Sequence, residues 1–255
     1  MFSLGIDSGS TTTKAVLFDG SDIVETKLIS TSANPKKAIQ TMYEQFDNEE
    51  IGYVITTGYG RNLLENADKK VTEITCHARG AKFLHPQTTK IIDVGGQDSK
   101  VIVLNSDHQV EDFLMNDKCA AGTGRFIEMM MQKVEQPLDS IDDFAKGCTP
   151  IEINSMCAVF AESEVISLLA QDKNPGDIVM GVIESISRRV SIFSQKLTGA
   201  DGDIFFSGGL AGSTIFKQTL EKYLKCEIYT HELSQYAGAI GAALIAYEQL
   251  KKQMR

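Results

Sequence analysis

Two stretches of the chain, LGIDSGSTTTKAVLFDGSDIV (residues 4–24) and KIIDVGGQDSKVIVLNSDHQV (residues 90–110), decide the fold because they superpose after a shift of 86 positions. The shift aligns Asp7 with Asp93, Gly9 with Gly95, Thr13 with Ser99 and Lys14 with Lys100. Each stretch is typical of a short apolar strand, a turn of Asp, Gly and small polar residues, and a second apolar strand. The repeat therefore predicts that each half of the chain opens with a β-meander whose first hairpin tip carries an Asp and a glycine.

Helical signals follow each meander. Asn34-Pro35 and Asn174-Pro175 each place an N-cap before a proline, which predicts helices that run to about Phe46 and Gly199. The remaining pattern predicts helices over 73–84, 126–134, 160–170, from Gly209 to about Leu224 and over 236–252, and strands over 51–58, 203–207, 226–230 and between Cys148 and Cys157. Strands that alternate with helices after a meander indicate an α/β protein with a mixed sheet in each half, so we expect two domains facing a shared cleft.

The composition narrows the classes of function. The chain has 255 residues, of which 42% are apolar and 23% charged, as in an ordinary globular protein. A net charge of −9 with both signs mixed argues against nucleic-acid and membrane partners. No apolar run approaches the roughly 20 residues of a membrane span, and the early Asp7 argues against a secretory signal. The 5 dispersed cysteines predict a reducing, cytoplasmic location, with thiols or metal ligands rather than disulfides.

The segment from Asp7 to Lys14 has the ingredients of a phosphate site. Gly9 allows a phosphate to approach the backbone closely, Lys14 supplies positive charge, and the Asp7 carboxylate suits a hydrated Mg²⁺ ion. The hydroxyl and amide donors are those of Ser10, Thr11, Thr12 and Thr13. The segment contains neither a Walker A sequence nor a G-x-G-x-x-G fingerprint, and a Ser/Thr-rich turn taken alone is usually only a turn.

Two further elements raise the case for nucleotide binding. The second tip carries Asp93, Gly95, Gly96, Gln97 and Asp98, and two such tips across a cleft could clamp a triphosphate and its metal. Gly208-Gly209 follows a strand and precedes a helix, so it could admit adenine or ribose close to the backbone. The alternative is that these are three unrelated tight turns.

Cys119 and Cys157 each precede a predicted helix, where free amides and a partial positive charge favour a thiolate or an anionic cluster. A four-iron cluster needs four thiolates, and the simplest closure of two is a twofold symmetric dimer. Buried inert thiols and a reactive thiol pair remain open, whereas a zinc site lacks the short ligand spacings. Cys148 stays open as a further ligand. Cys226 is interpreted as structural, and Cys76 with His77 as poor joint ligands on one helix.

The order DSGSTTTK, DVGGQDSK and SGGLAGS resembles the phosphate-1, phosphate-2 and adenosine motifs of the acetate-kinase, sugar-kinase, heat-shock ATPase and actin superfamily. The stretches TGYGR (57–61), MNDKCAAGTGRF (115–126) and FAESEVISL (160–168) are similar to one branch, the activator ATPases of 2-hydroxyacyl-CoA dehydratases in the BadF/BadG/BcrA/BcrD family. The resemblance spans the whole chain. It implies a duplicated actin-like, ribonuclease-H-like fold, with one domain of residues 1–88 plus the helix 238–255 and a second of residues 89–237.

The resemblance also implies a function: an ATP-dependent one-electron donor with Mg²⁺, in which one [4Fe–4S] cluster bridges Cys119 and Cys157 of two identical subunits. The implied acceptor is a 2-hydroxyacyl-CoA dehydratase, with a double-cubane cluster protein or an aryl-CoA reductase as alternatives. Ferredoxin or flavodoxin is the implied electron donor. A small-molecule kinase and a non-catalytic actin-like scaffold remain competing classes, although both would leave the two cysteines without a role.

Residue roles follow by position in the matched motifs. Gln97 or Asp98 would contact the γ-phosphate or orient the attacking water, with Asp93 as a helper. Glu162 would link the cluster to the nucleotide, unless it is simply an acid in the first turn of a helix. The remaining expected cofactor contacts are Gly122, Thr123, Gly124, Gly208, Gly209, Leu210 and Gln235.

Overall fold

The computed structural model describes residues 1–46, 50–117, 120–155, 157–197 and 202–254. The chain divides into two compact units. Unit 1 comprises Met1–Thr89, Leu104–Glu111 and His231–Arg255, and unit 2 comprises Lys90–Val103 and Asp112–Thr230. Across the described ranges, no helix is both long and apolar enough to span a bilayer.

Unit 1 is built on a mixed sheet of 5 strands in the spatial order β3 (Ile23–Ser30), β2 (Thr12–Phe18), β1 (Phe2–Ser8), β4 (Ile51–Thr57) and β5 (Lys69–Lys70). β1, β2 and β3 form the antiparallel meander predicted for the first half, and β4 runs parallel to β1. The hairpin register places Asp7 opposite Lys14 and Ser8 opposite Thr13.

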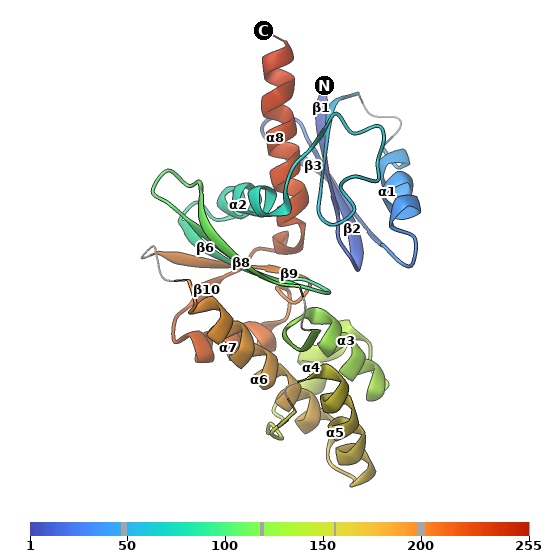
Figure 1. The fold of residues 1–255 in the computed structure, drawn as a ribbon, viewed down its shortest axis with the longest axis vertical. Helices are drawn as coiled ribbons and strands as arrows, with labels where there is room; N and C mark the ends of the chain where they lie inside the picture. Colours follow the sequence, from blue (N-terminus) through green and yellow to red (C-terminus); the bar gives the residue numbers. More distant parts are fainter. Residues whose placement is uncertain (47–49, 118–119, 156, 198–201, 255) are drawn as a thin grey trace. The chain divides into compact units, whose positions relative to one another are not determined.

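Helices cover both faces of this sheet: α1 (Pro35–Glu44) on one face, α2 (Glu73–Leu84) and α8 (Ala237–Gln253) on the other (Figure 1). Leu4 and Ile6 of β1 pack against α1. Gly5 between them points to the opposite face because side chains alternate along a strand. A Cβ on Gly5 would lie 2.2 Å from the Ala239 carbonyl oxygen, so α8 lies directly on the β1 backbone.

The second sheet has the order β10 (Ile228–Tyr229), β9 (Asp203–Gly208), β6 (Thr88–Val94), β7 (Ser99–Leu104) and β8 (Val110–Asn116). Apart from the ends of β6, β7 and β8 it belongs to unit 2, whose helices are α3 (Gly124–Lys133), α4 (Ile141–Ala145), α5 (Ala158–Ala170), α6 (Pro175–Ser194) and α7 (Thr214–Leu224). Short 3₁₀ turns are η1 (Ala120–Gly122) and η2 (Leu138–Ser140) in unit 2 and η3 (Ser234–Tyr236) in unit 1. One apolar core joins Val94 and Val101 of the sheet to Phe126 of α3, Ile183 of α6 and Phe216 of α7.

The capping signals have their predicted effect. The Asn34 side chain accepts a hydrogen bond from the Lys37 amide at 3.0 Å, and Asn174 accepts one from the Gly176 amide at 2.8 Å, so α1 and α6 begin at the prolines that follow. The strand predicted before Cys157 is wrong. Residues 150–155 are in no strand and pair with neither sheet; the Ile151 amide is bonded to α6 instead, and the Asn154 and Ser155 amides are bonded to α5.

Candidate functional site

The tip of the first hairpin, residues 9–11, is a tight turn that is hydrogen-bonded to Thr31. The Gly9 amide donates to the Thr12 carbonyl at 3.1 Å, and the Thr31 hydroxyl donates to the Gly9 carbonyl at 2.8 Å. The Thr13 hydroxyl is buried and lies 2.9 Å from that of Thr31. Ser10, Thr11 and Thr12 stay partly exposed. Their donors are therefore accessible to a ligand, whereas the Thr13 hydroxyl already has a partner.

Asp7 lies near the end of β1 and is 5% exposed. A Cβ on Gly58 would lie 2.4 Å from Asp7 Oδ1, and a Cβ on Gly238 would lie 2.7 Å from Oδ2, so no side chain crowds the carboxylate on these sides. With the residues described, Asp7 makes no hydrogen bond or ion pair. A nearly buried carboxylate without a protein partner fits a hydrated Mg²⁺ ion, which takes few carboxylates and keeps its waters.

Sequence reasoning missed the role of the TGYGR loop and of Ser8. The Gly60 amide donates to the Ser8 carbonyl at 2.9 Å, and a Cβ on Gly60 would lie 2.2 Å from Ser8 Oγ. That hydroxyl is fully buried and has no partner among the described atoms. Tyr59, between the two glycines of the motif, is 79% exposed. The glycine spacing in TGYGR was the available signal, since it indicates backbone packed closely on the hairpin.

His77 is a second residue that the sequence interpretation left aside. Its ring borders Asp7, because Cε1 lies 3.0 Å from the place where a Gly238 Cβ would be. Its Nδ1 lies 2.9 Å from the Glu73 carbonyl oxygen. The neighbouring Cys76 is buried, which raises the pKa of its thiol to about 12. Cys76 therefore remains a protonated core residue.

The charged side chains of the second hairpin form ion pairs with one another. The Lys100 ammonium lies 3.2 Å from Asp93 Oδ2 and 2.6 Å from Asp98 Oδ2. The Ser207 hydroxyl donates to Asp93 Oδ1 at 2.8 Å. Asp93 and Lys100 are both buried, and Gln97 at the tip is exposed. Of the predicted catalytic residues in this hairpin, Gln97 and the partly exposed Asp98 are thus the ones within reach of a ligand.

The second tip also holds the start of α3. The Gly95 carbonyl accepts from the Gly124 amide and the Gly96 carbonyl from the Arg125 amide, both at 2.8 Å. The Ser99 hydroxyl donates to the Gly122 carbonyl. The predicted contacts Gly122, Thr123 and Gly124 are therefore brought to Gly95 and Gly96. This connects the second tip directly to the helix that follows the Cys119 segment.

The residues expected to contact adenosine lie in different environments. Gly208 has φ +98° and its Cβ would lie 2.1 Å from the Val94 carbonyl oxygen, so only glycine fits there. A Cβ on Gly209 would meet nothing within 4 Å, which leaves open space for a ligand. Leu210 is buried in the core of unit 2. Gln235 lies in η3 of unit 1 and is partly exposed.

Cys157 is the N-cap of α5 and its side chain is exposed. Its carbonyl accepts from the Ala161 amide at 2.9 Å, but its side chain makes no capping hydrogen bond, and the first turn of α5 holds no acidic residue. An exposed, unpaired thiol beside free helix amides fits a ligand to an anionic iron–sulfur cluster. Cys119, the other predicted ligand, lies outside the described residues.

Glu162 and the other cysteines complete the set of predicted positions. The Glu162 carboxylate lies 2.8 Å from the Lys133 ammonium at the end of α3 and so ties α3 to α5, the helices that follow the two predicted ligands. Cys148 is half-buried against Gly176, whose Cβ would lie 2.5 Å from its sulfur, and desolvation raises the pKa of its thiol. Cys226 is exposed and lies just before β10, and desolvation raises the pKa of its thiol. In the described ranges, no three His, Cys, Asp or Glu side chains converge as a metal site.

Two five-stranded mixed sheets with helices, each opening on an Asp-bearing hairpin, define an actin-like ATPase fold. This confirms the fold that the resemblance in sequence implies. The family model described as the BadF/BadG/BcrA/BcrD ATPase family matches residues 4–246. The chain belongs to this family, and it is an ATPase that binds ATP or ADP.

The relatives support this assignment along the full length. An uncharacterized Escherichia coli protein, YjiL, is 46% identical over 96% of both chains. The (R)-2-hydroxyglutaryl-CoA dehydratase activating ATPase of Acidaminococcus fermentans is 40% identical over 99% of both chains. Among solved structures, the activator of the 2-hydroxyisocaproyl-CoA dehydratase from Clostridium difficile with bound ADPNP superposes with a TM-score of 0.92. It is 38% identical, and the match covers 100% of this chain and 97% of that one.

Proposed function

We propose that this ATPase is an ATP-dependent one-electron donor that works as a homodimer. One [4Fe–4S] cluster would be held by Cys119 and Cys157 of each subunit. The observation that carries the proposal is Cys157, an exposed and unpaired thiol at the free N-terminus of α5. When bound, the cluster supplies the one-electron redox chemistry.

On the nucleotide side, Asp7 would hold Mg²⁺ through water, while Lys14 and the donors of residues 10–13 would bind the phosphates. Gln97 or Asp98 would orient the attacking water, with Asp93 holding Lys100 in place. Gly208 and Gly209 would border the adenosine, with Leu210 in the core of unit 2, and Gln235 would be a weaker nucleotide contact. The open space at Gly209, and the lack of a hydrogen bond or ion pair from Asp7 to any described residue, support this assignment.

Coupling between the nucleotide and Cys157 would run through unit 2. A ligand at Gln97 or Asp98 acts on the tip whose carbonyls bind the first amides of α3. Lys133 at the end of α3 is bonded to Glu162 of α5, and α5 begins at Cys157. ATP and ADP can drive a change along this route only if they bind its two arrangements with different affinity.

The electron acceptor would be a 2-hydroxyacyl-CoA dehydratase. Two relatives that match nearly the whole chain carry names of dehydratase activators, at 40% and 37% identity. A reductase role toward an aryl-CoA reductase or a double-cubane cluster protein is the second candidate, because one of the benzoyl-CoA reductase subunits of Thauera aromatica is 31% identical over 201 residues. Ferredoxin or flavodoxin in the cytoplasm would supply the electron.

The test is iron and acid-labile sulfide analysis of anaerobically purified protein, with size determination. We expect a brown dimer with about four irons, one cluster, per two subunits. Cys157→Ala and Cys119→Ala should each remove the iron and leave ADP binding intact. Cys226→Ala is the matched control, since Cys226 is also an exposed thiol, and it should keep its iron.

A colourless protein that binds ATP normally would overturn the proposal and favour a kinase or a scaffold. A brown protein whose Cys157→Ala variant keeps its iron would overturn the ligand assignment. If the wild-type protein is brown, adding a dehydratase and measuring its ATP-dependent activation separates the first acceptor class from the second.

A further inference from the structure

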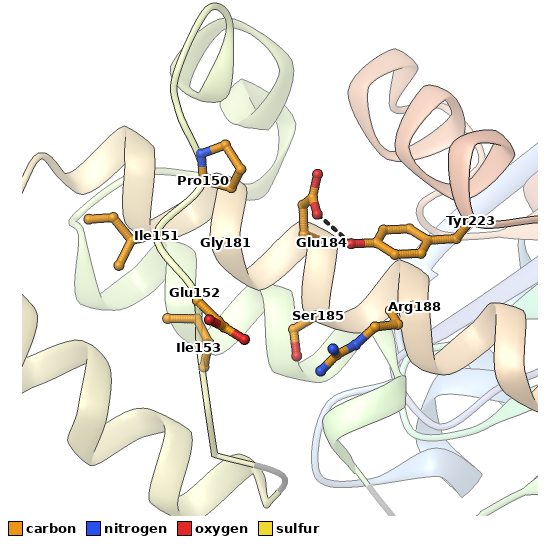
Figure 2. Close-up of a pocket in the computed structure, with 9 residues that line it drawn as sticks. All are labelled: Pro150, Ile151, Glu152, Ile153, Gly181, Glu184, Ser185, Arg188 and Tyr223. Carbon is orange, nitrogen blue, oxygen red and sulfur yellow. Dashed lines mark hydrogen bonds between the residues drawn. The ribbon is translucent and has the colours of Figure 1, made fainter.

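Unit 2 contains a cavity of about 220 Å³ whose lining includes neither the nucleotide motifs nor Cys157 (Figure 2). One wall is an extended segment, one is α6, and the third is the end of α7. Its lining residues are Pro150, Ile151, Glu152, Ile153, Gly181, Glu184, Ser185, Arg188 and Tyr223. Since a water takes up roughly 30 Å³ in the liquid, the cavity suits a ligand of about six to ten non-hydrogen atoms.

The extended wall, residues 149–155, is here named the strap, and it is fixed at both ends. At its start, the Thr149 amide donates to Asp177 Oδ1 at 2.9 Å and the Ile151 amide to the Asp177 carbonyl at 3.0 Å. At its end, the Ser155 amide donates to Glu164 Oε2 at 2.9 Å. The strap therefore bridges α6 and α5 and ends shortly before Cys157.

The middle of the strap is not held in this way. The amides of Glu152 and Ile153 make no hydrogen bond to any residue that the structure describes. Immediately before them, a Cβ on Gly181 would lie 1.8 Å from the Ile151 carbonyl oxygen, so the strap touches α6 there. Beyond this contact the strap spans the cavity with free donors.

Three side chains of the cavity also have unused hydrogen-bonding capacity. Ser185 is 6% exposed, and its hydroxyl has no partner among the described atoms. Neither Arg188 nor Glu152 forms an ion pair with a described residue, although both line the same space. Figure 2 shows Ser185 between the Glu152 carboxylate and the Arg188 guanidinium. A buried hydroxyl without a partner is costly unless something binds to it.

Glu184, the other acid of the cavity, is already occupied. Its carboxylate binds the Lys222 ammonium at 2.7 Å and accepts the Tyr223 hydroxyl. Burial opposes its ionisation, but these hydrogen bonds, helped by the charges of Lys222 and Arg188, hold its pKa below the ordinary value. Of the charged side chains in the lining, Arg188 and Glu152 form no ion pair with a described residue, although the Arg188 charge also acts on Glu184.

We propose that this cavity is a binding site for a small α-amino acid. The carboxylate of the ligand would bind the Arg188 guanidinium and the Ser185 hydroxyl, and its ammonium group would bind Glu152. A zwitterion matches one unpaired cation and one unpaired anion, whereas a dianion such as phosphate would face Glu152 and Glu184 without enough positive charge. Binding there does not require the proposed electron transfer, because none of the lining residues is an expected ligand of the cluster or of the nucleotide.

The position of the site suggests what binding would change. A ligand between the strap and α6 would restrain residues 152 and 153, the part that has no hydrogen bonds of its own. Since the strap continues into Cys157 and α5, occupancy would reduce the motion of that thiol. The amino acid would in this way act on the N-terminus of α5 from a site outside the nucleotide motifs.

The experiment is calorimetric titration of the anaerobically purified full chain with each of the twenty proteinogenic L-amino acids, and of the best binder's deaminated and decarboxylated analogues. We expect at least one amino acid to bind and both analogues to bind at least tenfold more weakly. Hydrogen exchange of the Glu152 and Ile153 amides should be fast in the free protein and slower with the ligand. No binding of any amino acid up to about 10 mM would overturn the proposal.

Variants assign the contacts. Arg188→Gln should abolish binding of the amino acid. Glu152→Gln should bind the deaminated analogue and the amino acid with equal affinity. Ser185→Ala should leave the unliganded melting temperature unchanged or raise it, while weakening binding several-fold, because its hydroxyl has no partner to lose. Arg79→Gln, a surface arginine paired with Glu248, is the control and should bind normally. Equal binding by all four variants would overturn the site, as would a wild-type protein that prefers the deaminated analogue.

Discussion

The two hairpins of the duplication have the same strand register, but their charged side chains differ in burial and in ion pairing. Lys14 stands opposite Asp7 and Lys100 opposite Asp93 in the same register. Lys100 is buried and bonded to two carboxylates. Lys14 is partly exposed and forms no ion pair with the residues described. The first copy therefore keeps its charges available for a ligand, whereas the second uses them to hold its own tip.

The two hairpin tips also differ in their backbone hydrogen bonds. In unit 1 the hairpin is bonded to the segment after β3 and to the TGYGR loop, and no helix of the described ranges is hydrogen-bonded to its tip. In unit 2 the carbonyls of Gly95 and Gly96 bind the first amides of α3. The described donors of the first tip are therefore left accessible, whereas the second tip is hydrogen-bonded to α3, and paired substitutions can test whether the two copies have different roles.

The largest difference is expected between Lys100→Met and Lys14→Met. Removing Lys100 leaves Asp93 buried beside Asp98 without a cation, which should lower the free energy of unfolding by about 3–5 kcal/mol. Lys14→Met has no ion pair to break, so its effect on stability should stay within about 0.5 kcal/mol while nucleotide binding weakens. Urea denaturation and ADP titration measure both quantities. Similar stability losses in the two variants would contradict the contrast.

Asp7→Asn and Asp93→Asn should separate the hairpins by activity. Asp7 forms no hydrogen bond or ion pair with a described residue, so its loss should leave stability nearly unchanged. It should reduce ATP hydrolysis about 10²–10³-fold, the size of effect seen when one electrostatic contact to the reacting groups is removed. Asp93→Asn should mainly lower stability, by about 1–3 kcal/mol, because Ser207 and Lys100 lose a charged partner. Phosphate release at saturating Mg²⁺-ATP is the readout. Partial rescue of Asp7→Asn by raised Mg²⁺ would sharpen the assignment.

A smaller contrast lies in two buried serines. Ser207 donates to Asp93, so Ser207→Ala should cost about 1.5–3 kcal/mol of stability. The Ser8 hydroxyl is fully buried and has no partner in the part of the chain that the structure describes, so Ser8→Ala should be neutral or stabilising in the free protein. The two melting temperatures, measured without and with Mg²⁺-ADP, test this. A smaller ADP-induced rise in Ser8→Ala alone would indicate that the Ser8 hydroxyl serves the nucleotide site.

The difference between the hairpins marks what sequence can predict. The repeat, the Asn-Pro caps and the apolar periodicity predict both meanders and nearly all of the long helices, since these signals are local. The burial and pairing that distinguish Lys100 from Lys14 are not encoded locally. Asp93 and Asp98 are near Lys100 in sequence, but Asp93 is also bonded to Ser207, more than a hundred residues away. The strand predicted before Cys157 failed for the same reason: its apolar alternation is real, but its hydrogen-bonding partners are helices.

The glycines near the first hairpin are visible in the sequence, but the sequence does not show which atoms they contact. Gly58, Gly60 and Gly238 each face a side chain or backbone atom of Asp7 or Ser8 closely enough to exclude a Cβ. Nothing in the sequence relates Gly238 in α8 to Asp7 in β1, because their contact arises only when α8 returns to the first sheet. Contacts of this type require the tertiary structure.

The smallest expected effects come from the aligned pair Thr13 and Ser99, whose hydroxyls stabilise different neighbours. Thr13→Val and Ser99→Ala each remove one hydrogen bond and should cost about 1 kcal/mol, so stability alone cannot distinguish them. Amide exchange can. Thr13→Val should speed exchange at Thr31, whose amide is bonded to the first tip, and leave α3 unchanged.

Ser99→Ala should instead speed exchange at Gly124 and Arg125, because Ser99 anchors the Gly122 carbonyl just before these amides reach the second tip. The nucleotide dependence of that exchange then tests the connection itself. If the second tip transmits the nucleotide state, ATP and ADP should give different protection at these two amides in the wild-type protein and nearly equal protection in Ser99→Ala. Unchanged exchange at both amides in Ser99→Ala would mean that α3 is held independently of the hairpin, and the contrast between the two copies would reduce to their charges.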